Sequence, residues 1–249
     1  MADGPEPVNS AKSDRPAAVI AGAGGTLGQA AARALARKGF EVWCGWHKSE
    51  GRVNALASEL GGRAVRLSAQ EDPAEVLEEI FQKRQRLDVL VNASGINIIG
   101  PALGLDDEDW HKVFDLNFSW ARKLSAAALR IMLPQKGGRI IHLSSSAARL
   151  GGRGQLNYAV SKAALERLVK GLALEAGPRG VLINAVAPGV IESPMTERII
   201  AQHSEKLLDR ISSRRFGRPE EVAEVIAFLA GPEAGYINGT VIAVDGGLW

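Results

Sequence analysis

The amino-acid sequence predicts a single-domain, doubly wound α/β fold with about seven parallel strands and helices on both faces of the sheet. Three observations indicate this fold. Short apolar runs alternate with longer stretches of helical composition along almost the whole chain. The run 87–91 is nearly all apolar, as expected of a strand buried on both faces. A glycine-rich turn follows the first apolar run, at the sheet edge where such folds bind ligands.

The strands are expected at 17–21, 41–46, 64–67, 87–91, 139–143, 181–186 and 240–244, because each run is short and rich in aliphatic residues. The helices are expected between them, at 27–37, 52–60, 73–83, 107–133, 158–176 and 219–230. Pro73 suits the first turn of its helix, and the helix 107–133 is expected to end before Pro134. The alternation of strands and helices indicates that the strands are parallel and that right-handed crossovers join them.

Composition excludes several classes of protein. The 249 residues carry 30 Lys and Arg against 28 Asp and Glu, a net charge of +2 that does not suggest a nucleic-acid partner. Cys44 is the single cysteine and the four histidines are scattered, so neither an intrachain disulfide nor a metal site is expected. No apolar run is long enough for a membrane span. Residues 1–15 predict a disordered leader before a domain at 16–249, in a cytoplasmic protein.

The turn after the first strand has the composition of a dinucleotide-binding turn. Glycines let backbone amides approach a pyrophosphate closely, and the N-terminus of the following helix adds a positive dipole end. A turn that only packs the helix against the strand would have the same composition, so the motif alone does not decide. The candidate cofactor-binding residues here are Gly22, Gly24, Gly25, Thr26, Leu27 and Gly28.

The end of the second strand bears on the choice of cofactor. It reads Trp46, His47, Lys48, with no acid before Glu50. A carboxylate at this place would bind both ribose hydroxyls, whereas basic groups favour a 2′-phosphate. The sequence therefore predicts NADP(H) over NAD(H), the alternative being that His47 and Lys48 are only exposed turn residues.

Tyr158 and Lys162 lie one turn apart on the same face of the helix expected at 158–176. A free tyrosine has a pKa near 10, and a nearby ammonium group favours the phenolate and lowers that value. The pair is therefore a candidate proton donor, although a half-exposed helix without any catalytic role can carry the same two residues. The isolated His142, on a strand, is expected to be a core residue with satisfied hydrogen bonds.

Five separated motifs, in order along the chain, resemble those of the short-chain dehydrogenase/reductase family over nearly all of residues 16–249. They are the segment 92–95, Asn117, the pair Tyr158 and Lys162 with Ser145 upstream, the Pro-Gly turn in 184–189, and the segment 244–247. The resemblance implies a Rossmann fold and an NAD(P)-dependent oxidoreductase.

The resemblance also implies a role for each of four catalytic residues. Tyr158 would donate a proton to a substrate carbonyl, and Lys162 would lower the pKa of Tyr158 and bind the nicotinamide ribose. Ser145 would hold the carbonyl oxygen, and Asn117 would anchor a water chain to solvent. The resemblance also adds residues to the candidate cofactor-binding set. They are Tyr158, Lys162, Ser68, Asn92, Ala93, Ser94, Gly95, Pro188, Gly189 and Ile191.

Three departures from the family pattern concern the cofactor site. Ala21 replaces the threonine that opens the family's glycine motif, and Thr26 replaces its middle glycine. The acid usual near the end of the third strand is absent, so Ser68 is the residue expected to contact adenine there. These differences bear on which atoms would contact the phosphates and the adenine of the cofactor more than on whether the cofactor binds.

Within the family, the segments 151–158, 188–195 and 215–222 are most similar to those of 3-oxoacyl-(acyl-carrier-protein) reductases of fatty acid biosynthesis. This implies NADPH-dependent reduction of a 3-oxoacyl thioester, linked to acyl carrier protein or CoA, in a homotetramer. Lys136 and Arg179 would then meet an acidic carrier protein, or else be solvated surface charges. The segment 193–215 resembles a mobile substrate lid, or an ordinary amphipathic helix pair.

Two other functions remain open at this point. One is oxidation or reduction of another ketone or secondary alcohol, such as a sugar, a steroid or a small ketone. The other is a catalytically silent nucleotide-binding regulator, since a fold does not determine a function.

Overall fold

The computed structural model describes residues 14–249, so most of the predicted leader 1–15 lies outside the described residues. The described chain forms a 7-stranded parallel sheet in the order β3-β2-β1-β4-β5-β6-β7. The predicted fold class is confirmed. The strands are β1 (Ala17–Ala21), β2 (Glu41–Trp46), β3 (Arg63–Arg66), β4 (Val89–Asn92), β5 (Gly138–Leu143), β6 (Val181–Pro188) and β7 (Val241–Val244).

The strand order reverses between β1 and β4, which creates the crevice where doubly wound sheets bind ligands. The register aligns the carboxyl ends of the central strands. Ala21 pairs with Asn92, Asn92 with His142, and His142 with Ala185. Residues that end or follow β1, β4, β5 and β6 therefore meet at one edge.

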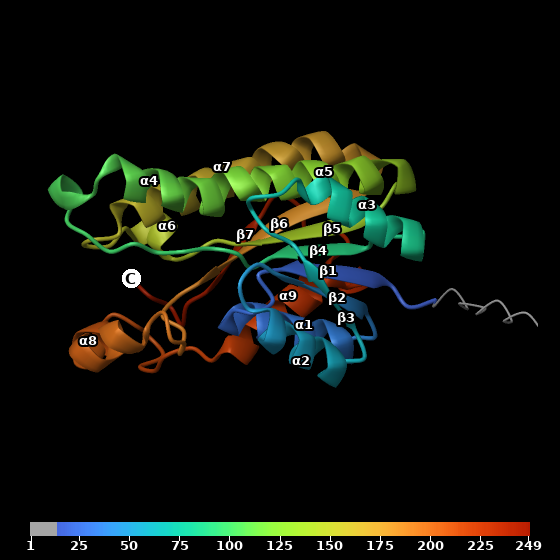
Figure 1. Ribbon diagram of the computed structural model, residues 1–249. Coiled ribbons are helices and arrows are strands. Elements are labelled where there is room, and N and C mark those ends of the chain that lie inside the picture. Colours follow the sequence, from blue (N-terminus) through green and yellow to red (C-terminus); the bar gives the residue numbers. More distant parts are fainter. Residues whose placement is uncertain (1–13) are drawn as a thin grey trace, which may run out of the picture.

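Helices cover both faces of the sheet (Figure 1). On one face lie α1 (Thr26–Arg37), α2 (Glu50–Glu59) and α9 (Pro219–Ala230). On the other lie α3 (Pro73–Arg84), α5 (Trp120–Gln135) and α7 (Leu156–Ala176). Each layer has its own core: Ile20 packs with the first set of helices and Val19 with the second. Successive strand residues face opposite cores, which explains why β1 is apolar at every position.

The helix expected at 107–133 consists of three parts. It starts as α4 (Asp107–Phe114), continues through a π-helical turn at Asp115–Ser119, and then becomes α5. The expected end before Pro134 is wrong, because α5 runs to Gln135. A proline removes one intrahelical hydrogen bond, and in the last turn little helix remains to be disrupted. Lys136, in the left-handed conformation, then ends the helix.

Two helices were not predicted as separate elements: the single-turn α6 (Ala147–Leu150) and α8 (Glu197–Asp209). No residue of α8 is buried, and this helix stands away from the sheet (Figure 1). His203, at φ −140 and ψ 23, kinks α8 into two pieces. Single turns of 3-10 helix occur at Ala102–Gly104, Gly177–Arg179 and Pro232–Ala234. Within residues 14–249, no helix is both long and apolar enough to cross a membrane.

Candidate active site

The four predicted catalytic residues meet at the carboxyl edge of the sheet. Ser145 directly follows β5, and Asn117 lies in the π-helical turn before α5. Tyr158 and Lys162 are in the first turns of α7, which packs on β6. Elements far apart in the sequence thus supply a single cluster of polar side chains.

Burial raises the pKa of the Tyr158 phenol above its usual value, and the neighbouring Ser145 hydroxyl, placed to hydrogen-bond with the phenol, opposes part of that shift. The group that opposes burial is Ser145, whereas the sequence suggested Lys162. Tyr158 therefore carries its proton at neutral pH and can donate it.

Lys162 is only 3% exposed, and its Nζ donates a 2.7 Å hydrogen bond to the Leu143 carbonyl oxygen. The same Nζ lies 5.7 Å from the centroid of the Tyr158 ring. Burial without a carboxylate partner disfavours the ammonium form and lowers the pKa of Lys162 to about 8. The side chain is thus fixed beside the tyrosine with a proton that can leave near neutral pH.

Asn117 is fully buried and connects three segments of the chain. Its Nδ2 donates to the Ile96 carbonyl and to Ser161 Oγ, each at 3.0 Å, and its Oδ1 accepts the Ile96 N–H at 2.9 Å. A Cβ on Gly95 would lie 3.2 Å from both Asn117 Oδ1 and Lys162 Nζ, so the loop after β4 runs directly over these two groups. π-Helical turns of this kind are frequent at functional sites.

The glycine turn has the shape that a bound pyrophosphate requires. A Cβ on Gly28 would lie 2.2 Å from the Gly22 carbonyl oxygen, so α1 can pack this closely only with glycine there. Gly25 precedes α1, whose first turn has no side-chain cap and no acidic residue. The amides of Thr26, Leu27 and Gly28 are therefore free to bind an anion, and these residues fit a dinucleotide cofactor.

The ends of β2 and β3 bring two predicted cofactor residues together. His47 Nδ1 lies 2.8 Å from Ser68 Oγ, which also accepts the Gln70 N–H at 3.2 Å. The imidazole and the adjacent Lys48 are exposed at the sheet edge, and the half-buried Trp46 ends β2.

Arg52 belongs to this group, although the sequence analysis did not single it out. Its Nη1 donates a 3.3 Å hydrogen bond to the Gly24 carbonyl oxygen, so the guanidinium lies over the glycine turn. Its basic side chain at the start of α2, four residues after Lys48, is the sequence signal that could have identified it.

The remaining predicted cofactor residues line the same edge. Asn92, Ala93, Ser94 and Gly95 follow or end β4, and a Cβ on Gly22 would lie 2.8 Å from the Ser94 nitrogen. After β6, the Pro188 carbonyl accepts the Ser146 N–H at 2.9 Å, and the Gly189 N–H donates to Val244 at 3.0 Å.

Ile191 is only 4% exposed and pairs with Gly217 through an isolated bridge. All the predicted cofactor residues therefore lie on the edge that carries the catalytic cluster. Among residues 14–249, no group of three or more His, Cys, Asp or Glu side chains could hold a metal ion.

Lys136 and Arg179 lie at the opposite edge. Lys136 follows α5 and Arg179 precedes β6, both at the amino ends of their strands, and both are exposed. The two residues are neighbours, because Gly180 directly follows Arg179 and lies against Lys136. A Cβ on Gly180 would be 2.7 Å from the Lys136 carbonyl oxygen. The length of β5 separates them from Ser145, roughly 20 Å at 3.3 Å per residue.

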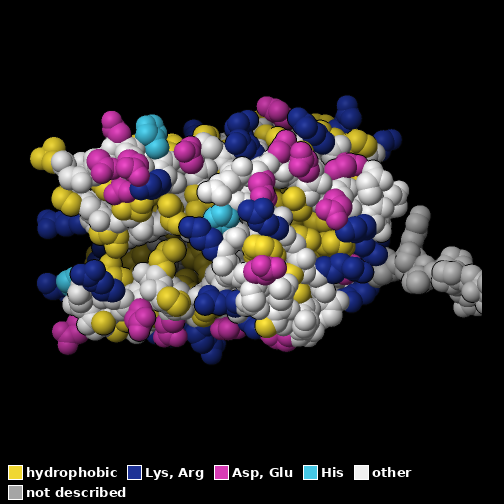
Figure 2. All heavy atoms as spheres, viewed as in Figure 1, with side chains coloured by type: hydrophobic (Ala, Val, Ile, Leu, Met, Phe, Trp, Pro, Cys, Tyr) yellow, Lys and Arg dark blue, Asp and Glu magenta, His cyan; other side chains and the backbone are white. Residues whose placement is uncertain are grey.

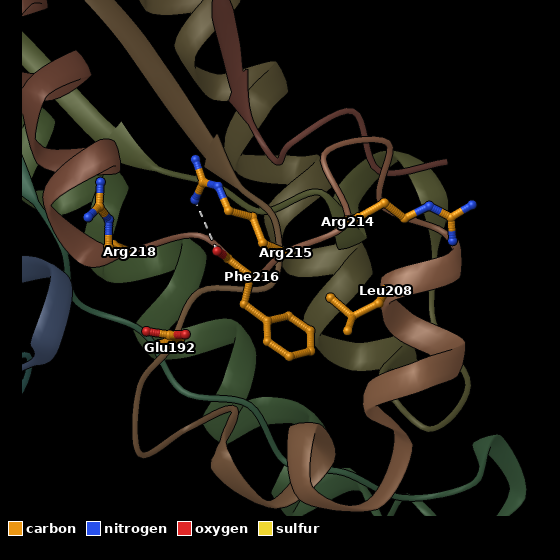
Figure 3. Close-up of a pocket in the computed structure, with 6 residues that line it drawn as sticks. All are labelled: Glu192, Leu208, Arg214, Arg215, Phe216 and Arg218. Atoms are coloured by element: carbon orange, nitrogen blue, oxygen red, sulfur yellow. Dashed lines mark hydrogen bonds between the residues drawn. The ribbon is translucent and has the colours of Figure 1, made fainter.

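A hollow lined with hydrophobic side chains opens between the α8 region and the helices above it (Figure 2). A cavity of about 510 Å³ lies beside α8, with Leu208 and Phe216 facing each other inside it (Figure 3). Glu192, Arg214, Arg215 and Arg218 complete its lining. These arginines face carboxylates: Arg214 pairs with Asp209, and Arg215 and Arg218 pair with Glu221.

Comparison with known proteins agrees with this geometry. Residues 22–249 match the model of a family described as "Enoyl-(Acyl carrier protein) reductase". The chain is 37% identical to the 3-oxoacyl-[acyl-carrier-protein] reductase of Thermotoga maritima, covering 92% of this chain and 96% of that one. It is 39% identical to the enzyme of that name from Synechocystis sp., covering 93% and 96%.

The solved structure of gox2181 superposes with a TM-score of 0.90 and 28% sequence identity, covering 94% of this chain and 95% of that one. The fold, the cluster of predicted catalytic residues and the relatives agree. The chain belongs to the short-chain dehydrogenase/reductase family and is an oxidoreductase that acts on a CH–OH or C=O group.

Proposed function

We propose that the protein reduces a 3-oxoacyl thioester, carried by acyl carrier protein or CoA, to the 3-hydroxyacyl thioester with NADPH. The observation that carries the proposal is the buried Lys162 beside the Tyr158 ring, with Ser145 next to the phenol. The names of the relatives at 37% and 39% identity support the substrate, which belongs to fatty acid biosynthesis.

The bound dinucleotide supplies the hydride, and the chain supplies the proton and the orientation of the substrate. Ser145 holds the carbonyl oxygen within reach of Tyr158, and the protonated phenol donates its proton as the alkoxide forms. Lys162 stands next to the phenol and stabilises the negative charge left on it. Asn117 holds the Ile96 loop and anchors the water chain through which protons return from solvent.

The preference for NADPH rests on the edge of the sheet formed by His47 and the basic residues Lys48 and Arg52. Ser68 Oγ lies 2.8 Å from His47 Nδ1 and so fixes the orientation of the ring. In the tautomer in which Nδ1 accepts the Ser68 proton, Nε2 carries a proton and can donate to a 2′-phosphate. Replacing His47 with Asp would place a carboxylate there, repel that phosphate and raise the relative activity with NADH.

The distance between Lys136 and Ser145 bears on how a carrier protein docks. A carrier that contacts Lys136 and Arg179 cannot reach the catalytic cluster of the same chain unless its acyl arm spans the sheet. In a homotetramer, another subunit can place its basic pair beside this chain's cluster. We therefore assign the two residues to carrier docking on a neighbouring subunit's site.

The experiment that tests the function follows NADPH oxidation with a short 3-oxoacyl thioester, with NADH and a simple ketone in parallel. Turnover of the thioester with NADPH far above that with NADH supports the proposal. Turnover of the ketone alone keeps the reaction class and rejects the thioester. Without turnover, fluorescence titration with NADPH separates an untested substrate from a lost cofactor site, and Tyr158→Phe is the inactive control.

A further inference from the structure

Three buried polar side chains form a chain of hydrogen bonds beneath the catalytic edge. Ser125 on α5, His142 on β5 and Asn92 at the end of β4 are each at most 1% exposed. Ser125 Oγ lies 2.9 Å from His142 Nε2, and Asn92 Nδ2 lies 3.4 Å from His142 Nδ1. The reaction described above uses neither His142 nor Ser125.

The bonds determine where each proton lies. Ser125 donates its hydroxyl proton to the Ala121 carbonyl at 2.8 Å, so toward His142 it can only accept. His142 must therefore carry its proton on Nε2, which leaves Nδ1 as an acceptor for the Asn92 NH₂ group. Asn92 is thereby oriented with Oδ1 away from the histidine, where it accepts the Ser94 N–H at 3.2 Å.

A neutral His142 is also what its surroundings favour. Burial and the charge of Lys162 both disfavour the imidazolium and lower the pKa of His142 to about 3. A protonated Nδ1 would face the NH₂ group of Asn92 and break the chain. At neutral pH the histidine therefore stays neutral, and its Nδ1 can accept from Asn92.

The turn 92–95, which this series of hydrogen bonds reaches through Asn92, lies between the cofactor turn and the catalytic cluster. On one side the Ser94 nitrogen is against Gly22, where a Cβ would come within 2.8 Å. On the other side Gly95 is against Lys162 Nζ and Asn117 Oδ1. A displacement of Asn92 would therefore alter the surface on which the dinucleotide rests.

We propose that His142 is a positioning residue for cofactor binding, which acts through Asn92 to hold the turn 92–95 in its binding conformation. The proposal rests on the function proposed above, because it assumes that this turn contacts the dinucleotide. His142 touches neither cofactor nor substrate. Its effect is a lower dissociation constant for NADPH, with little effect on the chemical step.

The test measures the NADPH dissociation constant by fluorescence titration, and kcat at saturating NADPH, in variants of the full chain. His142→Leu keeps the volume but removes both hydrogen bonds, and should raise the dissociation constant about three- to tenfold with kcat within about twofold. His142→Gln can accept from Asn92 and donate to Ser125, and should recover most of the affinity. Ile140→Val, on the same strand and in the same core, controls for lost packing.

If His142→Leu binds NADPH as tightly as Ile140→Val, the inference is overturned. It is equally overturned if kcat falls while the dissociation constant stays unchanged. Should His142→Leu fail to fold, Ser125→Ala removes the acceptor of the Nε2 proton and should weaken NADPH binding by about two- to threefold. A wild-type chain that binds no NADPH would instead reject the proposed function.

Discussion

Asn117 donates a 3.0 Å hydrogen bond to Ser161, whose hydroxyl in turn donates to the Tyr158 carbonyl at 2.8 Å. The buried amide thus holds the helical turn that separates Tyr158 from Lys162. Through its two bonds with the Ile96 backbone it also holds the loop that follows β4. One side chain therefore sets the distance between the catalytic helix and the cofactor side of the site.

Asn117→Ala should reduce both stability and turnover. It leaves the N–H and C=O of Ile96 without their partner, which costs about 1–3 kcal/mol of unfolding free energy. It also releases the loop over Lys162, so kcat should fall by at least about tenfold. Urea unfolding and steady-state kinetics measure the two effects, with Ser119→Ala in the same π-helical turn as the control. Unchanged kcat in a destabilised variant would show that Asn117 is structural only.

Most of the sheet could be predicted from the sequence, because its strands are short apolar runs separated by amphipathic helices. The predicted strand 87–91, for example, overlaps the observed Val89–Asn92. The π-helical turn at Asp115–Ser119 could not be predicted. Its sequence is compatible with an uninterrupted helix, and the wider turn is stabilised by tertiary hydrogen bonds of Asn117 that local propensity does not describe.

The site was predictable as a set of residues but not as a set of contacts. Helical spacing placed Tyr158 and Lys162 on one face, and the resemblance to the family added Ser145. Neither revealed that Ser145 opposes the effect of burial on Tyr158, or that Lys162 donates to the Leu143 carbonyl. Such contacts depend on the packing of α7 against the end of β5, which no periodicity in the sequence encodes.

Tyr158→Phe should abolish the chemistry and leave cofactor binding intact. The variant keeps the aromatic ring and loses only the proton donor, so kcat should fall by about 10²- to 10⁴-fold. The NADPH dissociation constant should stay within about twofold of the wild type. Initial rates and fluorescence titration on the same preparation test both statements. Retained turnover would mean that another group donates the proton.

Reversing the charge of Lys136 and Arg179 should affect only carrier-bound substrates. In the double variant Lys136→Glu, Arg179→Glu, the KM for a 3-oxoacyl carrier protein should rise about tenfold at low salt, with less effect at high salt. The KM for a small 3-oxoacyl thioester without a carrier should not change, because such a substrate lacks the acidic carrier surface that the two basic residues would meet. Equal effects on both substrates would contradict a docking role.

Stability should fall on mild acidification because of His142. Its pKa is about 3 in the folded chain against 6.5 when it is solvated, so the unfolded chain takes up the proton first. The contribution of His142 is therefore complete above pH 6.5 and is lost progressively as the pH falls toward 3. Between pH 7.5 and 5.0 the loss is about 2 kcal/mol of unfolding free energy, at 1.36 kcal/mol per pH unit.

Chemical unfolding of the wild type and of His142→Gln at both pH values isolates this effect. The glutamine has no proton to gain, so the variant should lose less stability than the wild type by about 2 kcal/mol, whatever other groups titrate. His111, which is exposed, provides the matched control: His111→Gln should keep the pH dependence of the wild type. If both glutamine variants lose stability equally with acid, His142 is not held neutral in the folded chain.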